Sequence, residues 1–239
     1  MTKFEKTGGK RIQLLRSLLM PDLDFNIIGV EHAAHGLTPL LHFKLGVTNT
    51  PATETIQSVI LQAQIQIQAP GRSYNENEKP KLIDLFGTPG TWGTTLRARL
   101  WTLSSTTIRT FSGSTEAILP VPCSFDLNVA GTKYFYALDD GEVPLLFLFS
   151  GTIFYAAEDG RLQVQQISWN KECTYQMPVS VWQKMMDHHY PNTAFVTLQR
   201  GVFDRLHQYK QGAGVSSWDQ AIERLLAQNE KTEVTKAAP

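Results

Sequence analysis

The chain has 239 residues, of which 42% are hydrophobic and 10% aromatic, so one sizeable core can form. Lysine plus arginine and aspartate plus glutamate each number 22, which makes the formal net charge zero. No overall field therefore draws the protein to nucleic acid or to an anionic membrane. The longest apolar segment is residues 143–149, and a membrane-spanning helix needs about 20 such residues. We expect no nucleic-acid binding and no membrane insertion.

The two cysteines, Cys123 and Cys173, are too few for a disulfide framework. Both lie in strand-like segments, where buried free thiols are expected, although their separation allows one bond between them. Residues 12–20 are apolar, but Arg16 interrupts them and no small-residue cleavage site follows, so no export signal is predicted. These features together favour a cytoplasmic protein.

Residues 1–21 are predicted to form a flexible N-terminal tail, after which the pattern is typical of β-strands. The clearest period-two alternation is "VILQAQIQIQ", residues 59–68. In this segment Leu61, Ala63, Ile65 and Ile67 share one face, and four glutamines share the other. The pattern predicts a half-buried antiparallel strand. Its neutral polar face is either solvated or covered by another layer or a partner.

Residues 70–93 interrupt the strands, and "NENEKPKLIDLF" predicts a helix with Leu82, Leu85 and Phe86 on one face and Asn75 as its cap. Strand patterns resume from about residue 96 and include 123–129. A hairpin of 143–156 with 162–169 is also expected.

From residue 178 the periodicity is helical, and residues 229–239 are predicted to be a disordered tail. The expected architecture is α+β: an antiparallel β-sheet or sandwich of about eight strands with a C-terminal helical layer. Residues 22–228 would form a single domain, β-rich over 22–177 and helical over 178–228.

Three carboxylates surround one glycine at residues 139–142, namely Asp139, Asp140 and Glu142. Grouped carboxylates can carry out acid–base chemistry or hold a hard cation. Asp-Gly is equally the ordinary composition of a turn that ends a helix. The cluster is therefore a candidate ligand-binding site, with a turn as the alternative.

Two histidines, His32 and His35, are weak candidates for a metal site in "EHAAH". The zincin pattern places two histidines four apart on a helix with a glutamate between them. Here the histidines are three apart, Glu31 lies outside them, and the composition favours a loop. No Gly-x-Ser-x-Gly nucleophile elbow is present. No catalytic residue, metal or cofactor is assigned from these patterns.

Several segments resemble an uncharacterised bacterial family, a domain of unknown function, over about residues 22–228. They are "KYFYALDDGEVPLLFLFSGTIFY" at 133–155, with "LPVPCSFDL" and "LFGTPGTWGTTLR" upstream and "PVSVWQKMMDHHYPN" downstream. The resemblance implies no activity, catalytic residue or cofactor. It implies an accessory or maturation role, because members of the family occur in gene neighbourhoods of uptake nickel–iron hydrogenases.

Three functional hypotheses follow from the sequence. The first is a non-catalytic, cytoplasmic interaction or accessory protein with a protein partner, associated with a hydrogenase. The second is an enzyme or small-ligand-binding protein that uses Asp139, Asp140 and Glu142. The third is a metal-binding protein that uses His32 and His35. The sequence leaves the oligomeric state open.

Overall fold

The computed structural model describes residues 20–125, 129–157 and 160–237. The chain divides into two compact units, Met1–Thr193 and Ala194–Pro239, and each is described by itself. The predicted N-terminal tail lies almost wholly outside the described residues. Among the described helices, we find none that is both long enough and apolar enough to cross a bilayer.

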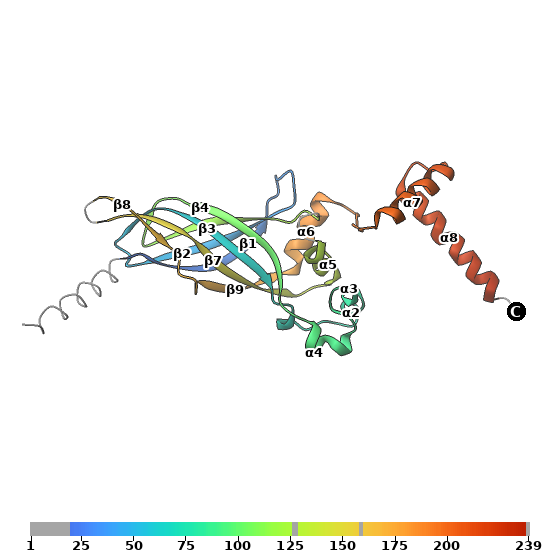
Figure 1. The fold of residues 1–239 in the computed structure, drawn as a ribbon, viewed down its shortest axis with the longest axis horizontal. Helices are drawn as coiled ribbons and strands as arrows, with labels where there is room; N and C mark the ends of the chain where they lie inside the picture. The colour runs from blue at the N-terminus through green and yellow to red at the C-terminus, as the bar shows by residue number, and fades with distance from the viewer. Residues whose placement is uncertain (1–19, 126–128, 158–159, 238–239) are drawn as a thin grey trace, which may run out of the picture. The chain divides into compact units, whose positions relative to one another are not determined.

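The first unit contains two antiparallel sheets (Figure 1). Sheet A, in the order β1-β2-β6, consists of β1 (Asp22–His32), β2 (Leu40–Thr50) and β6 (Ser114–Pro122). Sheet B has the order β4-β3-β7-β8, with β5 paired to β3 and β9 paired to β7. Its strands are β3 (Thr55–Ile67), β4 (Arg99–Ile108), β5 (Phe111–Ser112), β7 (Glu142–Ala156), β8 (Leu162–Gln166) and β9 (Glu172–Pro178). The predicted α+β class with antiparallel sheets and C-terminal helices is confirmed.

Strand β3 lies between β4 and β7 in sheet B. Its alternation agrees with the prediction, since Leu61, Ala63, Ile65 and Ile67 are buried. These side chains point toward sheet A, so the intervening glutamines point away from it. A shift of register by one residue would exchange the two faces, and the alternation therefore fixes the pairing.

The core lies between the sheets and is rich in aromatic rings. Phe43 on β2 packs edge-on against Phe147 on β7, with ring centroids 5.2 Å apart. Phe25 on β1 contacts Phe149 on β7, at 4.7 Å. Burial of such a side chain contributes about 1.5–3 kcal/mol, and a favourable ring pair adds about 0.5–1.5 kcal/mol. The aromatic side chains of β7 in sheet B thus pack directly against those of sheet A.

Short helices occupy the segment that interrupts the strands. They are η1 (Ala69–Gly71), α2 (Glu78–Lys81), α3 (Ile83–Phe86), η2 (Pro89–Thr91) and α4 (Trp92–Thr95). The helix expected at residues 75–86 is present as α2 and α3, with Leu82 and Phe86 buried. Asn75 caps this segment, because its Oδ1 accepts hydrogen bonds from the N–H groups of Asn77 and Glu78.

Two longer helices, α5 (Val129–Ala137) and α6 (Val179–His189), lie at one end of the sandwich (Figure 1). Trp182 of α6 stacks on Phe135 of α5, with centroids 5.2 Å apart and planes 19° apart. The strand expected at 123–129 is not formed in the described part of that segment. Strand β6 ends at Pro122, because its partner β2 begins at Leu40, directly opposite, and α5 begins at Val129.

The second unit contains α7 (Arg200–Gly212) and α8 (Trp218–Ala237). The two helices meet through aromatic rings, with Phe203 and His207 of α7 beside Trp218 of α8. Lys210 lies over the Trp218 ring, 5.5 Å from its centroid. Helix α8 includes most of residues 229–239, for which the sequence predicts a disordered tail. Ser217 caps its first turn, because the Ser217 hydroxyl accepts a hydrogen bond from the backbone N–H of Gln220.

Candidate functional site

The acidic cluster forms the connection from α5 to β7. Helix α5 ends at Ala137, and β7 begins at Glu142. Gly141 between them has φ of +78°, a left-handed conformation that favours glycine. Asp139, Asp140 and Glu142 are all exposed. The three carboxylates therefore follow one another along an exposed turn, and none of them lines either of the two pockets described below.

Asp139 holds this turn against the helices of the 69–95 segment. Its carboxylate accepts hydrogen bonds from Lys81 Nζ at 2.7 Å and from Asn75 Nδ2 at 3.3 Å. The hydrogen bond from Lys81 is the largest cause that lowers the pKa of Asp139, although partial desolvation opposes it. The carboxylate thus links the turn to Lys81 and Asn75.

A buried ion pair lies beneath the turn. Arg72 and Glu78 form it, with side chains 8% and 1% exposed. The Glu78 carboxylate also accepts hydrogen bonds from the backbone N–H groups of Asn75 and Asp139, both at 3.0 Å. Arg72 Nη1 donates to the backbone oxygen of Glu142 at 3.0 Å. Sequence reasoning missed this pair, because Glu78 stands in a run of charged residues that looks solvated.

The two histidines of "EHAAH" are not brought together as a metal site. His32 is half-buried at the end of β1, whereas His35 is exposed in the connection to β2. The nearest imidazole to His32 in the ring contacts is His188 of α6, at 6.0 Å between centroids, and His188 in turn faces His189 at 5.1 Å. Among the described residues, no three His, Cys, Asp or Glu side chains are placed to hold a metal ion.

The three imidazoles do have an electrostatic consequence. His32 Nδ1 and His189 Nε2 are both enclosed and have no hydrogen-bond partner in the structure. Burial is the largest cause that lowers the pKa of His189, and the neighbouring His188 and His32 lower it further. This junction of α6 with β1 therefore favours a neutral His189.

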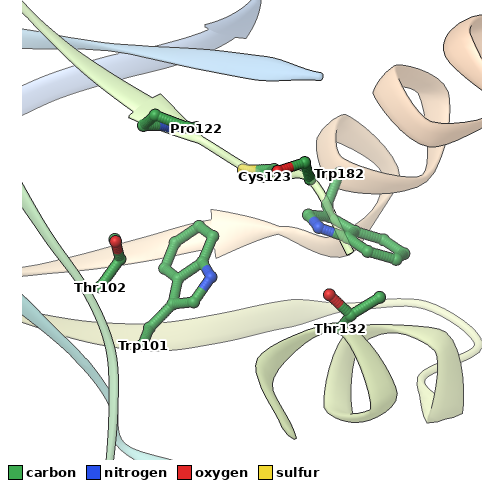
Figure 2. A pocket seen from close by; sticks show the side chains of 7 residues that line it. Trp101, Thr102, Pro122, Cys123, Thr132 and Trp182 are labelled. Atoms are coloured by element: carbon green, nitrogen blue, oxygen red, sulfur yellow. The ribbon is translucent and has the colours of Figure 1, made fainter. Parts of the chain in front are cut away.

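A small cavity at the helical end of the sandwich contains Cys123 (Figure 2). Trp101 and Trp182 lie on either side of it, with Cys123 and Thr132 between them. Its volume is about 10 Å³, which is room for one water molecule. Burial raises the pKa of Cys123 to about 12, and its thiol donates to the backbone oxygen of Val121. Such a thiol stays protonated and is a poor nucleophile. Cys123 and Cys173 are both free, as expected.

The outer face of sheet B is the surface formed by side chains of β3, β4, β7, β8 and β9 that point away from sheet A. The residues that pair across these strands define it. Its most exposed apolar members are Ile60, Leu100, Leu103, Leu162 and Val164. Its polar members include Gln62, Gln64, Gln66, Ser105, Ser150 and Gln166. Among the described residues of this face, Glu142 at the start of β7 and Glu172 on the edge strand β9 are charged, and both lie at its margin.

A groove crosses the middle of this face. Gln62 and Gln64 of β3, Leu103 and Ser105 of β4 and Ser150 of β7 line it, and its volume is about 320 Å³. Leu103 is 69% exposed at its rim. Charged side chains ordinarily cover an exposed sheet face in a soluble protein. The middle of this face, apolar and uncharged with amide groups, instead has the composition of the core of a protein–protein interface.

The fold and these surfaces define a two-sheet α+β sandwich protein with short helices at one end and an outer sheet face that is charged only at its margin. The chain belongs to a family of unknown function, DUF6084, whose sequence profile matches residues 20–234. The resemblance to a domain of unknown function is thereby confirmed. No curated protein matches the chain.

Three solved structures give distant matches. The first is a solution structure assigned to the late embryogenesis abundant (LEA) proteins, at 15% identity and a TM-score of 0.28, covering 73% of this chain and 89% of that one. The second is the ApaA protein of Bordetella pertussis, at 11% identity and a TM-score of 0.26, covering 66% of this chain and 94% of that one. The third is β-glucosidase 3B of Thermotoga neapolitana, at 13% identity and a TM-score of 0.24, covering 65% of this chain and 17% of that one. These TM-scores carry no argument about fold or function.

Proposed function

We propose that this protein is a non-catalytic, cytoplasmic interaction protein that serves as an accessory to another protein. The outer face of sheet B carries the proposal. Its exposed leucine, isoleucine and valine side chains lie among neutral amides and hydroxyls on a rigid sheet. Contact with a partner removes this apolar area from water, which contributes roughly 25 cal/mol per Å² before the costs of association.

The groups elsewhere in the molecule support the same proposal. Asp139 is engaged by Lys81, and Glu78 is engaged by Arg72. The Cys123 thiol is buried in a cavity with room for one water molecule. Of these side chains, Asp139 is one of the three predicted ligand candidates, and its contact with Lys81 is consistent with a non-catalytic role. The partner that the family resemblance implies is a nickel–iron hydrogenase or a protein that matures one.

Affinity purification from the source organism tests the proposal. The tagged wild-type chain is expected to retain a distinct protein that mass spectrometry identifies, and Leu103→Lys is expected to lose it because a charge then occupies the face. Leu37→Lys is the matched control, since Leu37 is fully exposed in the connection from β1 to β2. Equal recovery with Leu103→Lys and wild type would contradict the face as the binding surface. Identification of the retained protein tests the hydrogenase association.

A further inference from the structure

We infer that the outer face of sheet B takes a second copy of this chain, packed face to face. The inference rests on the proposed function in one respect, since both require this face to bind protein. It differs in the occupant, because the proposed function assigns the face to another protein and the inference assigns it to a second copy of this chain.

The hydrogen-bonding groups of the face complement themselves. A glutamine amide both donates and accepts, as does a serine hydroxyl, so Gln62, Gln64 and Ser105 can pair with the same residues of a second copy. A two-fold interface brings one patch against itself, and a patch with several like charges would then be repelled. Among the described residues of this face, Glu142 and Glu172 carry charges, and both lie at its margin and do not line the groove. The neutral middle of the face therefore matches the same face on another copy without repulsion.

The face also has the size that a stable dimer needs. Strands β3 and β7 have 13 and 15 residues, and sheet B is four strands wide at either end of β7. At the usual rise and strand spacing, such a face spans about 800 Å². A specific interface buries about 800 Å² on each partner, so the whole face is needed and is sufficient. Two sheets that pack in this way keep their strand directions within about 30° of each other.

The apolar residues supply the driving force for this contact. Leu103 of β4 stands opposite Gln64 and next to the groove, and Ile60 lies further along β3. Val164 of β8 lies beside Phe154 of β7 on the same face. In a face-to-face dimer these side chains enter the groove of the other copy. Because the contact carries almost no charge, its dissociation constant changes little with salt.

Sedimentation analysis of the full chain over a range of concentrations tests the inference. Wild type is expected at twice the chain mass, equally at low and high salt. Leu103→Lys and Gln62→Lys are each expected to weaken the dimer at least about tenfold, equivalent to about 1.4 kcal/mol. Leu37→Lys is expected to match wild type. Circular dichroism checks that each variant is folded, and the two variants on different strands guard against a folding defect in one of them.

The outcomes separate the inference from the proposed function. A wild-type monomer at every concentration, or a dimer that both lysine variants leave intact, overturns the inference. A monomer that nevertheless retains another protein through Leu103 overturns the inference and leaves the proposed function standing. A dimer that both variants dissociate, with no other protein retained from the source organism, supports the inference and contradicts the accessory role.

Discussion

Glu78 shows how one carboxylate organises the helical end of the sandwich. It is buried, and it joins Arg72, the backbone of Asn75 ahead of α2 and the turn after α5 by hydrogen bonds. A buried carboxylate is tolerated only when such partners replace its water shell. The pair with Arg72 therefore orders the acidic turn. Loss of the Glu78 carboxylate would leave the Arg72 guanidinium enclosed without a counterion.

We expect Glu78→Ala to lower the free energy of unfolding by about 3–5 kcal/mol, because it leaves Arg72 buried and unpaired. Urea denaturation provides the measurement. Glu76→Ala is the control, since the exposed Glu76 pairs only with Lys79 and should change stability by less than about 1 kcal/mol. The double variant Arg72→Met/Glu78→Leu should recover part of the loss. A Glu78→Ala effect as small as the control would contradict the structural role of the pair.

His189 gives a second prediction at this scale. Its pKa is lowered in the folded state from an ordinary value of 6.5, so the unfolded chain binds the proton more readily. Stability that is present above pH 6.5 is therefore lost as the pH falls through that value toward the lower folded pKa. Urea midpoints measured on either side of this pH should decrease with acidification. The decrease should be smaller in His189→Gln, and a wild-type slope in that variant would contradict the prediction.

At the scale of elements, β7 is the strand on which the sandwich depends. It pairs with β3 along almost its whole length and carries Phe147 and Phe149 into the core. Gly151 in this strand has φ of +144°, and a Cβ there would overlap the backbone oxygen of Ile60 on β3. The close approach of the two strands thus requires a residue without a side chain.

We expect Gly151→Ala to destabilise the protein by about 3 kcal/mol or more, because backbone has to move to relieve the overlap. Gly160→Ala is the matched control: Gly160 also has positive φ, but a Cβ there meets open space. The control should lose only about 1–2 kcal/mol, the cost of the left-handed conformation. Chemical denaturation of the two variants compares them, and equal losses would argue against the overlap.

The strands were largely predictable from the sequence, whereas the interactions near the acidic turn were not. The alternation in β3 specified its buried face, because period two is a local property of the chain. The contacts of Asp139 depend on Lys81, 58 residues away, and those of Glu78 on the backbone of Asp139, 61 residues away. The local sequence pattern carries no information about hydrogen bonds between residues so far apart. The three carboxylates therefore resembled a ligand-binding site. Their role as candidate ligands stays a prediction.

At the scale of the whole molecule, the two units differ in how they are stabilised. The buried aromatic and aliphatic core belongs to the sandwich, and in the described part of the second unit only Ala221 is buried. A pair of helices this short and this exposed is not expected to be stable alone. The residues between Thr193 and α7 have no regular structure, and a protease can reach such a segment.

We expect limited proteolysis to cut first between residues 193 and 200. A chain that ends at Thr193 should unfold within about 1 kcal/mol of the full chain, because the core of the sandwich is complete without α7 and α8. Mass spectrometry locates the cut, and urea denaturation compares the two chains. A large loss of stability on truncation would show that the helices belong to the same cooperative unit, as the sequence predicted for residues 22–228.

The outer face of sheet B, neutral except at its margin, also affects how the protein behaves while it is being synthesised. With a net charge of zero at neutral pH, the chain has little electrostatic repulsion to keep copies apart while they are crowded near the ribosome. With Glu142 and Glu172 both at its margin, the middle of this exposed face has no charged gatekeeper residue against disordered association. Colloidal stability should therefore be lowest near neutral pH.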